Sequence, residues 1–187
     1  MTPTAVILYG PPACGKNTIT DELARLDRRY ALFDRLKVGA GSTDGYRMTT
    51  PAEIAKLRAS DDVLYENHRY GNTYLIDRPR LASMLVAGQV PVLHLGQVAG
   101  VRTLIQFPAS WITVLLWCGK DTTAMRAKAR GSIDIDSRLQ AWDETAVDLQ
   151  QAADGDFLVR IDTDTTAPDV AAREIHSQLA SSSASTR

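Results

Sequence analysis

Residues 10–17 are Gly-Pro-Pro-Ala-Cys-Gly-Lys-Asn, and this stretch decides the fold. It follows the apolar run Ala5-Val6-Ile7-Leu8-Tyr9, and the residues after it, 18–23, predict a helix. A buried strand, a glycine-containing loop that ends in Gly-Lys and a helix are together the context of a phosphate-binding P-loop. The alternative is a tight strand–helix turn that happens to carry a lysine.

The loop residues predict an ATP site. Glycines let successive backbone N–H groups point at one anion, and the helix N-terminus adds the positive end of its dipole. Lys16 would place its ammonium group on the β- and γ-phosphates. Mg²⁺ is expected on the residue after this lysine, usually Ser or Thr; here Asn17 and then Thr18 are the two candidates. The predicted ATP-binding residues are Gly10, Pro11, Pro12, Ala13, Cys14, Gly15, Lys16, Asn17 and Thr18.

Composition limits the class of protein. A chain of 187 residues with 44% hydrophobic residues suits one domain with room for a small lid. The formal net charge of −1 gives no electrostatic argument for binding nucleic acid or a membrane surface. The first residues lack the pattern of a signal peptide, and no apolar stretch has the length of a membrane span. Two cysteines, Cys14 and Cys118, do not suggest a disulfide framework, so we expect a cytoplasmic protein.

Apolar segments alternate with helical patterns along the chain. This alternation predicts an α/β fold in which a parallel sheet is covered by helices on both faces, with ligands at the carboxyl ends of its strands. Residues 39–45 predict a mobile loop, and residues 181–187 a disordered tail. The expected core strands are residues 4–9, 90–95, 111–117 and 157–161. The expected helices are residues 16–28, 51–59, 79–87, 98–107, 120–129, 134–152 and 168–179, and Thr50 and Asp77 are the expected N-caps of the second and third.

Several segments beyond the loop resemble one known family. Residues 45–54, Gly-Tyr-Arg-Met-Thr-Thr-Pro-Ala-Glu-Ile, are similar to Asp-Tyr-x-Phe-Val-Ser-x-x-Glu-Phe of guanylate kinase, a P-loop nucleoside monophosphate kinase. Residues 63–66 and 70–74 are similar to its Phe-Leu-Glu and Gly-Asn-Tyr-Tyr-Gly segments. Residues 88–93 and 97–101 are similar to its Gly-Lys-x-Val-Ile-Leu and Gln-Gly segments. The resemblance covers roughly residues 5–161.

The resemblance implies a P-loop NTPase fold and an ATP-dependent kinase in one domain, residues 1–180. Its core would comprise residues 1–29, 77–126 and 138–180. An inserted segment, residues 30–76, would bind a small phosphorylated acceptor, and a short lid, residues 127–137, would close over the phosphates and exclude water. ATP and Mg²⁺ are the implied cofactors, and the oligomeric state stays open.

The resemblance also assigns individual roles. Lys16, Arg126, Arg130 and Arg138 would act in catalysis by stabilising the transferred phosphoryl group. Tyr46 and Tyr74, with Arg35 and Lys37, would bind the acceptor phosphate. Glu66 would recognise guanine, since a carboxylate can accept hydrogen bonds from N1–H and N2–H₂. From the residues alone, the tyrosines could instead be packing aromatics, Glu66 an exposed strand-end charge, and Arg126 with Arg130 a solvated helix face.

Three departures concern the acceptor. Asp34-Arg35-Leu36-Lys37 replaces the family's Thr-Thr-Arg-x-Pro-Arg, and Ile76 stands where a Ser or Thr helps to recognise guanine. His94-Leu95-Gly96 replaces an Asp-x-Asp segment. The sequence has no second histidine or cysteine at the spacing of a metal ligand, so it does not indicate that His94 binds a metal. GMP or dGMP is the first candidate acceptor. The alternatives are another phosphorylated metabolite, such as a modified nucleotide or a sugar phosphate, and a non-catalytic guanylate-kinase-like binding module.

Overall fold

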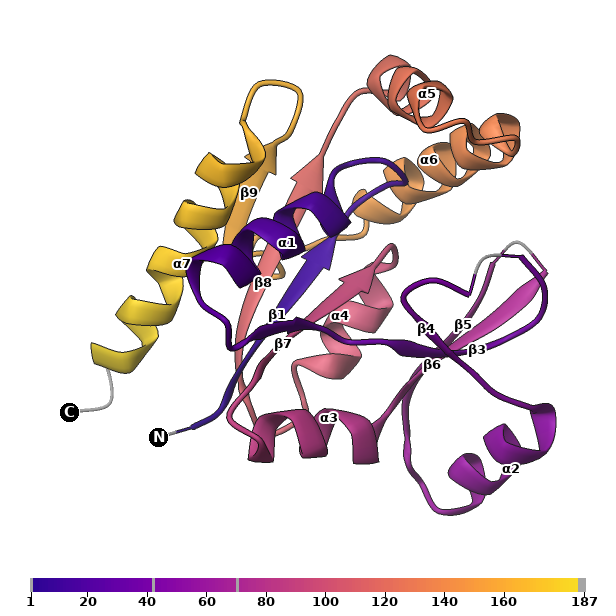
Figure 1. Cartoon of the computed structure of the whole chain (residues 1–187), viewed down its shortest axis with the longest axis vertical. Helices are drawn as coiled ribbons and strands as arrows, with labels where there is room; N and C mark the ends of the chain where they lie inside the picture. Colours follow the sequence, from indigo (N-terminus) through magenta and orange to yellow (C-terminus); the bar gives the residue numbers. More distant parts are fainter. Residues whose placement is uncertain (1, 42, 70, 185–187) are drawn as a thin grey trace.

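The computed structural model describes residues 2–41, 43–69 and 71–184 (Figure 1). Within these residues, five parallel strands form a core sheet in the order β2-β7-β1-β8-β9. Their bounds are Thr4–Tyr9 for β1, Tyr30–Leu32 for β2, Val90–Leu95 for β7, Ser110–Trp117 for β8 and Val159–Asp162 for β9. The predicted parallel α/β fold is therefore confirmed.

Helices cover both faces of the core sheet (Figure 1). On one face, Val6 and Leu8 pack in a cluster with residues of α1 (Lys16–Leu26) and α7 (Pro168–Ala184). On the other face, Ala5, Ile7 and Tyr9 pack with residues of α3 (Arg78–Val86) and α4 (Val98–Leu104). Both sides of β1 are apolar because a parallel strand between two helix layers has no solvent-facing side.

A second, smaller sheet stands beside the core. In the described part of the chain it has four strands in the order β4-β3-β6-β5, and only the β3–β4 pair is parallel. Helix α2 (Pro51–Ala59) covers one face, where Ile54 packs against Leu36 and Leu75. The strand bounds are Arg35–Val38 for β3, Tyr46–Met48 for β4, Val63–Arg69 for β5 and Asn72–Asp77 for β6. The opposite face of this sheet lines the cleft described below.

Local capping signals agree with the structure. The hydroxyl of Thr50 accepts a hydrogen bond from the Glu53 N–H at 3.2 Å and begins α2. The carboxylate of Asp77 accepts one from the Arg80 N–H at 3.2 Å and begins α3. Both helices have the predicted caps and start within one residue of the predicted positions, because a capping contact depends on residues that are three apart in the chain.

Three boundaries differ from the prediction. Strand β2 belongs to the core sheet, so the inserted segment starts after residue 32 and not at residue 30. Arg35–Val38, for which the sequence predicted no element, forms a strand because it pairs with two strands distant in sequence. Helix α7 continues to Ala184, so the first four residues of the expected disordered tail are helical. Residues 185–187 of that tail, and Ser42 of the expected mobile loop, lie outside the described residues.

The predicted lid residues, 127–137, form a helical hairpin. They span the end of α5 (Lys120–Ala129), a connection and the start of α6 (Ile135–Leu149).

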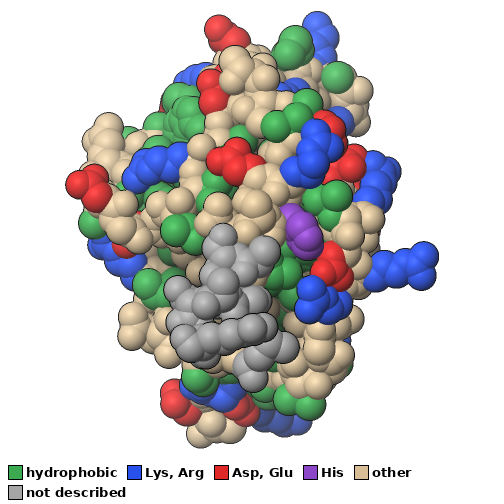
Figure 2. Space-filling view, turned by 90° about the vertical axis from the view of Figure 1, so that its left-hand side faces the viewer, with side chains coloured by type: hydrophobic (Ala, Val, Ile, Leu, Met, Phe, Trp, Pro, Cys, Tyr) green, Lys and Arg blue, Asp and Glu red, His purple; other side chains and the backbone are tan. Residues whose placement is uncertain are grey.

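Figure 2 shows one face of the molecule, on which acidic and basic side chains are interspersed, in keeping with the near-neutral net charge. Among the described residues, no helix is both long enough and apolar enough to span a membrane.

Candidate functional site

The loop between β1 and α1 follows a path that depends on glycine. A Cβ atom on Gly10 would lie 2.1 Å from the carbonyl oxygen of Leu116 in β8, and φ of Gly10 is +156°. Gly15, with φ of +94°, is the N-cap of α1. Its lack of a side-chain cap leaves the first N–H groups of this helix available to a ligand. Ala13 also has a left-handed backbone, with φ of 59°.

Lys16 lies over this loop. Its ammonium group donates hydrogen bonds to the carbonyl oxygens of Gly10 at 2.6 Å and Pro11 at 2.8 Å, and lies 3.4 Å from Sγ of Cys14. These partners are uncharged, so no carboxylate within the described chain neutralises the lysine. Its positive charge is therefore available to an anion at the loop.

A cleft of about 270 Å³ opens between the loop, the carboxyl end of β7 and the inner face of the small sheet. Of its described lining residues, none carries a carboxylate. Five carry a formal positive charge, namely Lys16, Arg35, Arg69, Arg130 and Arg138. The remaining lining residues are Gly10, Pro12, Ala13, Cys14, Gly15, Asn17, Tyr46, Asn67, Tyr74, His94, Leu95, Gly96 and Gln97. Such a cleft favours an anionic ligand.

Asn17 and Thr18 point into different cavities. Asn17 lines the main cleft beside Lys16. Thr18 lines a smaller cavity of about 150 Å³ on the other side of the loop, together with Arg126. Of the two magnesium candidates, Asn17 is therefore the one that faces the main cleft.

Two cations and two tyrosines form a cluster on the inner face of the small sheet. The rings of Tyr46 and Tyr74 lie with centroids 5.3 Å apart. The guanidinium carbon of Arg35 lies 5.7 Å and 5.0 Å from these centroids, and Nζ of Lys37 lies 5.4 Å and 5.9 Å from them. Strand register explains the cluster, because Arg35 is opposite Tyr46 and Lys37 is opposite Tyr74 on one face.

The two cations of the cluster have different surroundings. Lys37 is 2% exposed, and its ammonium group donates a hydrogen bond to the carbonyl oxygen of Ala40 at 2.6 Å. Arg35 contacts the tyrosine rings and makes no ion pair with another described residue. Arg35 can therefore accept an anionic ligand without breaking an existing pair.

The predicted lid arginines divide between two places. Arg126 donates to the carbonyl oxygen of Ala13 at 3.2 Å and to that of Thr163 at 2.6 Å, so it braces the loop from outside the main cleft. Arg130 lines both cavities and makes no ion pair with another described residue. Arg138 lines the main cleft while its Nε donates to Oδ1 of Asp134 at 2.8 Å.

Glu66 is not brought to the cleft. The antiparallel register pairs Asn67 with Tyr74 and Glu66 with Leu75, so the alternation of β5 turns Asn67 inward and Glu66 outward. Glu66 instead accepts a hydrogen bond from Nε of Arg58 in α2 at 3.1 Å. The structure therefore does not bring Glu66, the residue expected to recognise a base, to this cleft, since the similarity of residues 63–66 to the family motif does not fix the strand face.

His94, near the end of β7, contacts Thr20. The hydroxyl of Thr20 donates a hydrogen bond to the Lys16 carbonyl oxygen at 2.8 Å, and its oxygen lies 2.8 Å from Nε2 of His94. The contact between the Thr20 hydroxyl and Nε2 is a hydrogen bond whose donor is set by the tautomer of the imidazole. Burial, and then the charges of Lys16 and Arg35, hold the pKa of His94 well below its usual value. The imidazole is therefore neutral.

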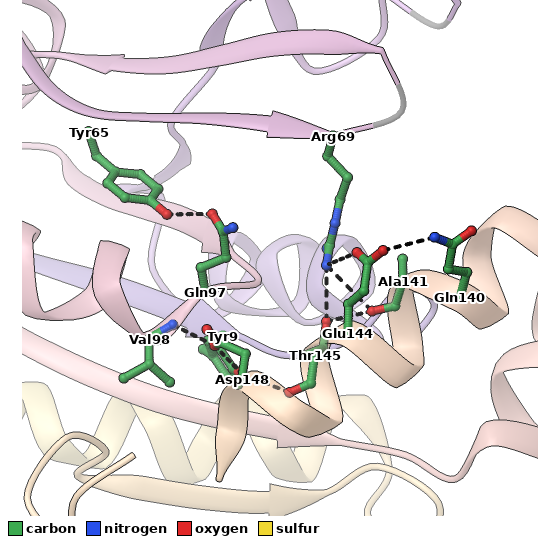
Figure 3. A network of polar contacts seen from close by, with 10 residues as sticks. All are labelled: Tyr9, Tyr65, Arg69, Gln97, Val98, Gln140, Ala141, Glu144, Thr145 and Asp148. Atoms are coloured by element: carbon green, nitrogen blue, oxygen red, sulfur yellow. Dashed lines mark hydrogen bonds and ion pairs between the residues drawn. The ribbon is translucent and has the colours of Figure 1, made fainter. Parts of the chain in front are cut away.

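Three polar residues of the cleft were missed as site residues, namely Asn67, Arg69 and Gln97. Arg69 reaches from β5 to α6, where it lies 3.4 Å from the Ala141 carbonyl oxygen and 3.4 Å from the side chains of Glu144 and Thr145 (Figure 3). Gln97 accepts a hydrogen bond from the hydroxyl of Tyr65 through Oε1 (Figure 3). The period-two pattern of β5 would have revealed Asn67 and Arg69 had the inward face been known.

A polar network fixes the elements behind this side of the cleft (Figure 3). The carboxylate of Asp148 in α6 accepts hydrogen bonds from the Tyr9 hydroxyl at 2.9 Å and from the Val98 N–H at 2.7 Å. This carboxylate replaces a local side-chain cap at the start of α4. Burial, and then Asp148, raise the pKa of Tyr9, so its hydroxyl stays a donor. The start of α4, whose N-cap residue is Gln97, is therefore tied to α6.

The chain is similar to known proteins in its structure and not in its sequence. No family model and no curated protein matches the chain. A guanylate kinase from Anaplasma phagocytophilum has a similar structure, with a TM-score of 0.62 and 13% identity over 97% of this chain and 86% of that one. The chain has the fold of P-loop kinases. The predicted structural resemblance is thereby confirmed.

Two further solved structures support the same fold. A shikimate kinase from Acinetobacter baumannii in complex with shikimate has a TM-score of 0.53 and 16% identity, over 97% of this chain and 95% of that one. A gluconokinase from Sinorhizobium meliloti 1021 has a TM-score of 0.51 and 18% identity, over 96% of this chain and 93% of that one. Since these similar structures carry different substrate names, the acceptor must be inferred from the cleft itself.

Proposed function

We propose that the protein is an ATP-dependent phosphotransferase that moves the γ-phosphoryl group of ATP onto a phosphate oxygen of a small phosphorylated acceptor. One observation carries the proposal: a P-loop cleft with five cationic side chains and, among its described lining residues, no carboxylate. Phosphoryl transfer depends on positioning and charge neutralisation, and both can be supplied by such a cleft.

The donor would lie at the loop. Lys16 and the N–H groups at the start of α1 would bind the β- and γ-phosphates, exchanging the carbonyl contacts of the lysine for phosphate oxygens. Arg130 and Arg138 would neutralise the charge of the transferred group. Arg126, tied to Ala13, would hold the loop in shape from outside.

Magnesium fits this arrangement through Asn17. No group of three His, Cys, Asp or Glu side chains that could hold a metal is found in the described ranges. A Mg²⁺ ion that enters with ATP would therefore take the Asn17 amide oxygen and fill its other positions with phosphate and water oxygens. Bound there, the ion would add positive charge beside the phosphates.

The chemical group that accepts the phosphoryl group can be inferred from the general bases that line the cleft. A hydroxyl acceptor must lose a proton, and kinases that use one place a carboxylate beside it. His94 is a poor substitute, because burial and two neighbouring cations lower its pKa. A phosphate monoester is already largely ionised at neutral pH and needs no base. Arg35 and Lys37, with the hydroxyls of Tyr46 and Tyr74, would bind that phosphate.

A coupled ADP-release assay with Mg·ATP tests the proposal. The acceptor panel contains nucleoside monophosphates, sugar phosphates, and the same compounds without their phosphate. We expect turnover with a phosphorylated acceptor, a new P–O–P linkage in the ³¹P spectrum, and loss of both with Lys16→Ala. Turnover only with the unphosphorylated compounds would show that a hydroxyl is the acceptor. The absence of Mg·ATP binding in calorimetry would instead indicate a binding module without catalysis.

A further inference from the structure

The part of the cleft beyond the tyrosine cluster is polar throughout. We call this part the acceptor wall; it consists of Asn67 and Arg69 from β5 and Gly96 and Gln97 after β7. None of these four described residues offers an aromatic ring or a large apolar face. The two tyrosines that line the cleft, Tyr46 and Tyr74, already carry Arg35 against their rings, and the imidazole of His94 lies outside this wall.

The acceptor wall gives a nucleobase little to stack on. Proteins usually hold an unpaired base against an aromatic ring or a guanidinium plane. The only guanidinium of the wall belongs to Arg69, which is directed at α6 (Figure 3). A Cβ built on Gly96 would lie 2.9 Å from NH1 of Arg69, so the backbone of Gly96 approaches this guanidinium closely. A base would therefore lack its usual flat partner at this wall.

The wall is well supplied with neutral hydrogen-bonding groups. Asn67 is half-buried, and its carboxamide makes no hydrogen bond with another described residue. Gln97 uses Oε1 for the Tyr65 hydroxyl, which leaves the hydrogens of Nε2 for a ligand. The ring of Tyr65 packs closely against the backbone of Gly100, since a Cβ built there would lie 2.8 Å from it. Carboxamides match hydroxyl groups, since a hydroxyl both donates and accepts.

The edge of guanine that carries N1–H and N2–H₂ does not match this wall. Those two donors require acceptors, and a carboxylate supplies them best. The only charge on the wall is the guanidinium of Arg69, while Glu66 faces the opposite side of the sheet and pairs with Arg58. A polar, uncharged and hydroxyl-bearing body is the better complement.

We infer that the acceptor is a sugar phosphate, whose hydroxyls bind Asn67 and Gln97 while its phosphate binds the tyrosine cluster. This inference rests on the proposed phosphotransfer and names its substrate class. In the reaction, the bond from the γ-phosphorus to the β–γ bridging oxygen breaks and ADP leaves with the electron pair. An oxygen of the sugar phosphate forms the new bond to the γ-phosphorus. The product is a sugar diphosphate.

The test compares acceptors and variants. ADP release is measured with Mg·ATP and a panel of pentose and hexose mono- and bisphosphates, against GMP, dGMP, AMP, CMP and UMP. We expect at least one sugar phosphate to be used about tenfold more efficiently than every nucleotide, the factor that one or two hydrogen bonds provide. A nucleotide preferred over all the sugar phosphates would overturn the inference and leave the phosphotransfer intact. Phosphorylation of none of these monoesters, despite Mg·ATP binding, would overturn both.

Variants assign the effect to the wall. Asn67→Ala should raise the KM for the sugar phosphate about tenfold and leave the KM for ATP unchanged, and Gln97→Ala should act in the same direction. Glu66→Gln, on the same strand but the opposite face, is the matched control and should change neither constant. Asn67→Asp, almost the same size, repeats the test if the alanine variant folds poorly. An effect of Glu66→Gln with none from Asn67 would refute the assignment.

Discussion

The two ends of the cleft are built in different ways. The proposed phosphate-binding end is made by one continuous segment, residues 10–17, which turns between β1 and α1. The acceptor end collects side chains from β3, β4, β5, β6 and the end of β7, across residues 35–97. The first depends on local backbone geometry, and the second depends on which face of each strand is turned inward. Substitutions should therefore act differently at the two ends.

The largest effect is expected at the loop. Lys16→Ala removes the ammonium group that would neutralise the transferred phosphate, and we expect kcat to fall by roughly 10²–10³-fold or more. ADP release measures the loss, and circular dichroism should show an unchanged fold. Lys56→Ala is the control, because Lys56 is exposed and pairs with Glu53 far from the loop. A Lys16 variant with wild-type kcat would remove the basis for the comparison.

Backbone geometry at the loop should dominate stability. Gly10→Ala places a methyl group against the Leu116 carbonyl oxygen of the neighbouring strand, which cannot move aside, so we expect a loss of about 3 kcal/mol or more. Gly131→Ala is the matched control: Gly131 also has a positive φ, of +69°, but open space around it, and should lose about 1 kcal/mol. Urea unfolding gives both values. Equal losses would mean that only φ, and not the contact with β8, constrains Gly10.

A smaller and more selective effect is expected at the acceptor end. Arg35→Ala removes a cation that makes no ion pair with a described residue, and should raise the acceptor KM about tenfold to a hundredfold while the ATP KM stays constant. Steady-state kinetics with either substrate varied separates the two constants. Arg58→Ala, on the outer side of the same sheet, should change neither. A higher ATP KM in the Arg35→Ala variant would show that the two ends act as one site, contrary to this prediction.

The smallest effect concerns His94, which lies between the two ends. Its pKa in the folded protein is below the unfolded value of 6.5, so below about pH 6.5 the unfolded chain binds a proton that the folded chain does not. Stability should therefore fall as the pH decreases, by up to about 1.4 kcal/mol per pH unit, and level off below the folded pKa. His94→Gln should reduce this slope. Urea unfolding of both proteins between pH 7.5 and pH 5 gives the comparison; equal slopes would contradict the lowered pKa of His94.

The success of sequence reasoning followed the same division. The Gly-Lys loop, the parallel sheet and the caps at Thr50 and Asp77 were predicted because each depends on residues close together in the chain. The face of β5 could not be predicted: the similarity of residues 63–66 to the family motif assigns base recognition to Glu66, whereas the pairing with β6 turns Asn67 toward the cleft. A shift of one residue reverses every side chain of a strand, and pairing with a distant strand sets that register.

By itself, the sequence determined the Gly-Lys loop between β1 and α1, the α/β class and the tyrosine and lysine residues that accompany Arg35. The tertiary structure alone decided that Asn17 and not Thr18 faces the cleft, that Arg126 braces the loop from outside, and that Glu66 is turned away. The physical reason is range. A loop between a strand and a helix is fixed by the steric limits of its own residues, whereas the direction of a strand side chain is fixed by hydrogen bonds to a partner far along the chain.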